Sequence, residues 1–163
     1  MKSAKELLSM VQFFYYRIRS ERLSVEALYM DTYGCDLKID YDLGNQISVE
    51  PDPRRTEGLL IDKILRLDKK LEKAQETINH YVSLIDWLEN LCITNLSESE
   101  LLVIRMSFFA KNPMNRRQIA QKLKYSEPWV AKQRISAYQK LDNALFDARQ
   151  THSLPEEFDD EHI

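Results

Sequence analysis

The stretch that decides the fold runs from residue 57 to residue 93 and reads EGLLIDKILRLDKKLEKAQETINHYVSLIDWLENLCI. Its apolar residues follow one another at alternating steps of four and three, without a break, over five heptads. The positions are Leu60, Ile64, Leu67, Leu71, Ala74, Ile78, Tyr81, Ile85, Leu88 and Cys92. This spacing predicts a coiled-coil helix of roughly 55 Å at 1.5 Å per residue. A lone helix cannot bury this apolar seam. We therefore expect residues 57–93 to pack against the first helix, against a second copy of the chain in a homo-oligomer, or against both.

The rest of the chain is also poor in residues that break helices. Only three of the 163 residues are glycine, and the stretches 1–33 and 59–112 contain neither glycine nor proline. Ser3 and Glu6 form a capping-box pattern at the start of a predicted helix over residues 3–33. We therefore expect an all-α protein in which residues 1–94 form a helical hairpin or coiled coil, with a long loop at 34–55. The scarcity of glycine also excludes the Gly-rich loops that hold nucleotide phosphates.

A second helical domain is predicted at residues 95–150. The pair Ser97 and Glu100 and the pair Asn115 and Gln118 each form a capping-box pattern, and Ser126 is an N-cap residue ahead of Pro128. These signals predict a short helix over residues 115–123, a turn at 124–125, and a longer helix from residue 126 to about residue 149. A short helix, a tight turn and a longer helix are typical of the helix-turn-helix of DNA-binding proteins.

The charges of the chain are segregated. Residues 101–141 contain nine Lys and Arg and only one acid, Glu127, which gives 9 − 1 = +8. Since the whole chain carries −3, the remainder carries −3 − 8 = −11. Such a surplus in one segment indicates a polyanion partner, and double-stranded DNA fits the predicted helix-turn-helix.

Within this domain the sequence resembles region 4 of bacterial sigma factors. The skeleton that carries the resemblance is Leu96, Glu98, Ile119, Ala120, Leu123, Ser126, Val130, Ala137 and Leu141. The complete layout, a long charged coiled coil followed by this module, resembles phage transcriptional regulators of the ArpU/RinA type. The resemblance implies binding to promoter DNA and regulation of late phage or prophage genes.

The resemblance also suggests which residues contact DNA. The start of the recognition helix corresponds to Glu127, Pro128, Trp129, Lys132 and Gln133. Arg134 stands where the sigma pattern often has an apolar residue. Either the helix is rotated, or Arg134 extends its charge to solvent. A rotation would transfer base reading from Gln133 towards Ser136. The predicted DNA-contacting residues are Arg116, Arg117, Lys122, Lys124, Ser126, Glu127, Trp129, Lys132, Gln133, Arg134 and Ser136.

Other classes of function find less support in the sequence. It contains no nucleophile–base pair, no metal-ligand spacing and no cofactor motif, so we expect a protein that is not an enzyme and needs no metal or cofactor. The absence of a signal-peptide pattern or a bilayer-spanning stretch predicts a cytoplasmic protein of a bacterial host cell with no membrane partner. Residues 151–163 are acidic and predicted to be a disordered tail. Two alternatives stay open: a DNA-recognition subunit of a phage packaging machine, and a sigma-like factor whose partner is RNA polymerase.

Overall fold

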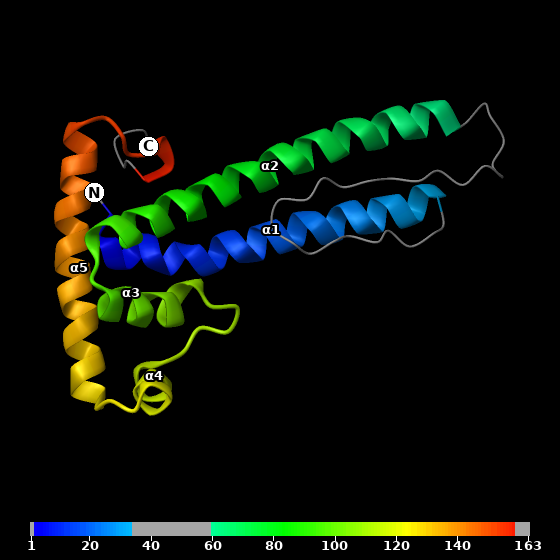
Figure 1. Ribbon diagram of the computed structural model, residues 1–163. Helices are drawn as coiled ribbons and strands as arrows, with labels where there is room; N and C mark the ends of the chain where they lie inside the picture. The colour runs from blue at the N-terminus through cyan, green and yellow to red at the C-terminus, as the bar shows by residue number, and fades with distance from the viewer. Residues whose placement is uncertain (1, 34–59, 159–163) are drawn as a thin grey trace. The chain divides into compact units, whose positions relative to one another are not determined.

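The computed structural model describes residues 2–33 and 60–158, and within these ranges it contains helices and no strand (Figure 1). The predicted all-α class is confirmed. The elements are α1 (Ala4–Tyr33), α2 (Leu60–Asn95), α3 (Glu98–Ile104), the π-helical turn η1 (Arg105–Phe109), α4 (Arg116–Leu123), α5 (Glu127–Gln150) and the 3-10 turn η2 (Glu156–Phe158). The predicted loop at 34–55 lies outside the described residues.

The chain divides into two compact units that do not follow the expected boundary near residue 94. One unit consists of Phe14–Ser83, and the other combines Met1–Phe13 with Leu84–Ile163. Both long helices therefore contribute to both units.

The unit of residues 14–83 is a pair of antiparallel helical segments from α1 and α2. Near the start of its α1 segment, the Phe14 ring stacks on the Tyr81 ring with centroids 5.5 Å apart. Further along α1, Val25 and Tyr29 form one buried cluster with Leu67 and Ala74 of α2. Because low residue numbers of α1 meet high numbers of α2, the two segments run in opposite directions. The heptad seam of α2 is thus covered here by α1 of the same chain.

In the other unit, side-chain caps begin the helices as the sequence predicts. At the start of α1, the Glu6 carboxylate accepts hydrogen bonds from the backbone N–H of Ser3 at 2.7 Å and from its hydroxyl at 3.0 Å. The next backbone N–H, that of Ala4, donates to the Asp142 carboxylate of α5 at 2.7 Å. These contacts satisfy helix N-terminal donors that have no partner within the helix.

The helix that follows Ser97 is shorter than the apolar run of its sequence suggests. α3 ends at Ile104, and the chain continues as the π-helical turn η1, in which the N–H of Ala110 donates to the carbonyl of Arg105 at 2.9 Å. The side-chain amide of Gln12, from α1, donates to the carbonyls of Phe108 and Ala110 and so occupies acceptors at the end of this turn. A wide turn of this kind leaves carbonyls that need an outside donor, and Gln12 supplies one.

The expectation of a disordered tail is wrong for residues 151–158. Phe158 is 1% exposed, and its ring lies 5.6 Å from the Trp87 ring of α2. The Lys2 ammonium donates to the carbonyl of Glu157 at 3.2 Å. Because a single aromatic residue can bury a large apolar area, it holds this otherwise acidic segment against the helices. Residues 159–163 lie outside the described residues.

Candidate nucleic-acid interface

The α4–α5 pair is built by local hydrogen bonds at each helix end. The Asn115 side chain accepts from the N–H of Gln118 at 2.9 Å, and the Gln118 side chain accepts from the N–H of Asn115 at 2.9 Å. This reciprocal capping box begins α4 as predicted. At the start of α5, the Ser126 hydroxyl accepts from the N–H of Trp129 at 3.3 Å.

The turn between the two helices depends on an unusual backbone conformation at Lys124. This residue has φ 59° and ψ 36°, in the left-handed region. The N–H of the next residue, Tyr125, donates to the carbonyl of Ala120 at 3.0 Å, which closes the end of α4 as in a Schellman motif. A left-handed backbone at a lysine raises the free energy of the folded chain by about 1–2 kcal/mol relative to a right-handed one, and a glycine would avoid this cost.

A small apolar core holds α4 and α5 at their positions. Its buried members are Val103 of α3, Ile119 and Ala120 of α4, and Val130 of α5, each at most 4% exposed. Trp129 packs against this core while remaining half-buried, and its ring stacks on the exposed Tyr125 ring with centroids 4.0 Å apart. Trp129 is therefore part of the packing as well as part of the surface.

Five of the cations predicted to contact DNA are exposed side chains of this pair. Arg117 and Lys122 extend from α4, Lys124 from the turn, and Lys132 from α5. Arg116 is exposed too, but its guanidinium lies 3.3 Å from the carboxylate of Glu127, and this ion pair joins the start of α4 to the start of α5. The structure thus brings together one paired and four further cations on α4, the turn and the beginning of α5.

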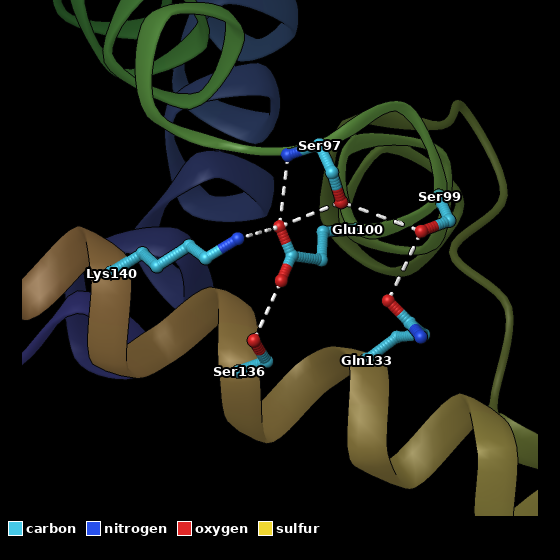
Figure 2. A network of polar contacts seen from close by, with 6 residues as sticks. All are labelled: Ser97, Ser99, Glu100, Gln133, Ser136 and Lys140. Atoms are coloured by element: carbon cyan, nitrogen blue, oxygen red, sulfur yellow. Dashed lines mark hydrogen bonds and ion pairs between the residues drawn. The ribbon is translucent and has the colours of Figure 1, made fainter.

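Three other predicted site residues form contacts within the unit, and one of them, Ser136, also lines the groove described below. Gln133 accepts a hydrogen bond from the Ser99 hydroxyl of α3 at 3.1 Å, and Ser136 donates to the Glu100 carboxylate at 2.6 Å (Figure 2). Arg134 is half-buried, with its guanidinium carbon 5.5 Å from the centre of the Phe108 ring and its nitrogens bonded to the Tyr138 hydroxyl. An arginine can occupy a position where an apolar residue was expected because flat aromatic faces accept its charge.

The Glu100 carboxylate is the centre of the polar network between α3 and α5 in Figure 2. It is 3% exposed and accepts from the N–H and hydroxyl of Ser97, both at 2.8 Å, from Ser136, and from the Lys140 ammonium at 2.8 Å. Burial alone would raise the pKa of Glu100, but the hydrogen bonds from Lys140, Ser136 and Ser97 outweigh it and lower the pKa to about 2. The carboxylate is therefore ionised at neutral pH and ties two helices together.

The face of α5 that points away from the core forms an open groove. From α4 it is lined by Arg116, and from α5 by Glu127, Pro128, Ala131, Lys132, Ile135, Ser136 and Gln139. Counted from Pro128, the later α5 residues follow the i+3, i+4, i+7, i+8 and i+11 spacing of one helix face. Ala131, Ile135 and Gln139 were not among the predicted site residues. Counting helical steps from Pro128 would have found them, whereas the resemblance directed attention to Gln133 and Arg134.

The residues that the structure describes lack two further kinds of feature. Among them there is no group of three or more His, Cys, Asp or Glu side chains that could hold a metal ion, and no helix long and apolar enough to cross a membrane. Comparison of the chain with protein-family models, with curated proteins and with solved structures finds no match.

Proposed function

We propose that the chain binds double-stranded DNA through α4 and α5, with α5 as the recognition helix of a helix-turn-helix. The observation that carries this proposal is the set of four exposed cations around the pair: Arg117, Lys122, Lys124 and Lys132. Within residues 2–33 and 60–158, no acidic side chain forms an ion pair with any of these four. Cations that have no internal partner are free to neutralise phosphates, which supply much of the affinity of a protein for DNA.

The cations that do have internal partners support the same assignment. Arg105 pairs with Glu89 at 2.7 Å and Lys140 with Glu100 at 2.8 Å, and neither belongs to α4, the turn or the first turns of α5. Glu127 is the only acid of residues 101–141. It lies at the start of α5 and is already paired with Arg116. The positive surplus is thus concentrated at the surface that would meet the DNA backbone.

We further propose that this binding serves transcriptional regulation of phage or prophage genes. This part rests on the resemblance of residues 96–145 to sigma region 4 and of the whole layout to regulators of the ArpU/RinA type. A DNA-recognition subunit of a packaging machine and a polymerase-binding sigma-like factor have different partners and assemblies. A ring of eight or more copies would indicate the first, and binding to RNA polymerase without promoter DNA would indicate the second.

The test uses the full chain and random-sequence duplex DNA in a mobility-shift titration. The double variant Lys122→Ala/Lys124→Ala should weaken binding to every duplex and make the log–log salt dependence shallower by roughly 2. The matched control Lys69→Ala/Lys70→Ala removes the same charge from exposed positions of α2 and should bind as the unchanged chain does. Equal losses in both variants would show that only net charge matters and would contradict the proposed surface. Footprinting on phage DNA, followed by transcription of the bound gene, then tests the regulatory part.

A further inference from the structure

The outer face of α5 carries an apolar side chain where a DNA-reading helix would meet the bases. Ile135 is 58% exposed, and it lies one helical turn after Ala131 in the groove that begins at Pro128. The cations Arg116 and Lys132 line the same groove. An exposed branched apolar residue among cations gains free energy only if it meets another apolar group.

Three polar side chains at the neighbouring positions of α5 already have partners within the unit. Gln133 uses its amide oxygen to accept from Ser99, Ser136 donates its hydroxyl to Glu100, and Arg134 bonds to Tyr138. The apolar part of the open groove is formed by Pro128, Ala131 and Ile135, and Lys132, Ser136 and Gln139 lie beside them.

The dimensions of α5 suit the major groove. An α-helix with its side chains is about 10–12 Å across. The major groove of B-DNA is about 12 Å wide, and the apolar group that its base edges present there is the C5-methyl of thymine. A cytosine methylated at C5 presents the same group at the equivalent position.

We infer that Ile135, with Ala131 beside it, recognises the C5-methyl group of a pyrimidine in the major groove. This inference rests on the proposed DNA binding and adds the chemical group that the recognition helix selects. Polar contacts from Lys132 and the phosphate contacts of α4 and the turn position the helix, while the methyl contact distinguishes one base pair from another.

The experiment compares duplexes that differ only in this methyl group. Duplexes that bind the full chain tightly are first selected from a random pool and then resynthesised with deoxyuridine in place of thymidine, one position at a time. A lost methyl contact worth about 0.8 kcal/mol corresponds to about a fourfold loss of affinity, which we expect at the position facing Ile135. In a second arm, 5-methylcytosine replaces cytosine at each position, so that a methylated cytosine can be distinguished from thymine as the natural source of the group.

Two variants complete the experiment. Ile135→Ala should bind the methylated and unmethylated duplexes equally, and it should fold because Ile135 is exposed and alanine favours helices. The matched control Phe146→Ala removes another exposed apolar residue of α5, roughly 16 Å further along the axis, and should keep the fourfold discrimination.

The experiment distinguishes failure of the methyl contact from failure of DNA binding. If the full chain selects duplexes but neither arm changes its affinity, or if Ile135→Ala keeps the discrimination, the methyl contact is refuted and the proposed DNA binding survives. If no duplex is selected from the pool, the proposed DNA binding fails and the inference fails with it.

Discussion

Ser136 of α5 donates a hydrogen bond to one carboxylate oxygen of Glu100 at 2.6 Å, while Lys140, one helical turn later, holds the other oxygen at 2.8 Å. Both donors lie on the side of α5 that faces α3. The buried carboxylate therefore acts together with the buried apolar residues of α5, such as Val130, in fixing the rotation of α5 about its own axis. In this orientation Pro128, Lys132 and Ile135 line the outer groove, and Gln133 bonds to Ser99 of α3.

The first prediction concerns the pH dependence of stability. Because the pKa of Glu100 is lowered to about 2 in the folded chain, its contribution is fully present above the unfolded pKa of about 4.5. It is lost as the pH falls from about 4.5 to about 2. A shift of this size corresponds to roughly 3–4 kcal/mol of the free energy of unfolding. Urea unfolding between pH 2 and pH 7 measures it.

Two variants isolate the Glu100 contribution. Glu100→Gln should lower the free energy of unfolding at neutral pH, and its difference from the unchanged chain should shrink as the pH falls towards 2. The control Glu98→Gln alters an exposed carboxylate two residues earlier on α3 and should leave the acid-dependent difference in place. A difference between Glu100→Gln and the unchanged chain that is constant over this pH range would contradict the role given to the network.

The second prediction separates two neighbouring residues of α5. Lys132 points outward, so Lys132→Ala should reduce the preference for a selected duplex over a scrambled one by about 1–3 kcal/mol. Gln133 bonds to Ser99, so Gln133→Ala should keep this preference and lower the free energy of unfolding by about 0.5–1.5 kcal/mol. Competition binding at fixed salt and urea unfolding provide the two measurements. The reverse pattern would mean that α5 presents a different face to the DNA.

Much of this fold could be predicted from local signals, because each signal acts over a few residues. The caps at Ser3, Ser97, Asn115 and Ser126 begin helices as expected, since a capping side chain bonds to a backbone group three residues away. The heptad pattern identified buried positions of α2, among them Leu67 and Leu88. The heptad pattern did not predict which element covers the seam, because it shows only which residues of α2 are buried.

The full orientation of α5 was beyond these local signals. It depends on Glu100, which lies 36 residues before Ser136 and 40 before Lys140, and charged residues are rarely expected in a buried place. The same limit explains the tail, where the burial of Phe158 depends on Trp87 of α2. A composition rich in acids predicts disorder unless a distant aromatic partner is known.

The third prediction uses the left-handed turn. Lys124→Asn removes a charge and places a residue that tolerates this conformation, so it should raise the free energy of unfolding by roughly 0.5–1 kcal/mol while weakening binding to all duplexes. The matched variant Lys122→Asn removes the same charge from within α4, where asparagine is a poorer helix former, and should lower stability. Thermal unfolding and mobility shifts measure the two effects. A fall in stability for Lys124→Asn would contradict the strain assigned to the turn.

The fourth prediction concerns the helical pair of residues 14–83. Leu67 is 2% exposed in the cluster with Val25 and Tyr29, so Leu67→Ala should cost about 2–5 kcal/mol of unfolding free energy. Leu65, two residues earlier, is 56% exposed, and Leu65→Ala should change little. Size-exclusion chromatography of both variants should show the same number of chains as the unchanged protein. Dissociation into smaller species by Leu67→Ala would show instead that the seam joins two copies.

The most direct test of the central proposal is the salt dependence of duplex DNA binding by the full chain. Each phosphate neutralised contributes about −0.9 to the slope of log affinity against log salt. The three exposed cations assigned to phosphates, Arg117, Lys122 and Lys124, therefore predict a slope of about −2.7. Replacing any one of them by alanine should make the slope shallower by about one. A slope near zero, or no binding even at about 50 mM salt, would contradict the assignment of α4 and α5 as a DNA-binding surface.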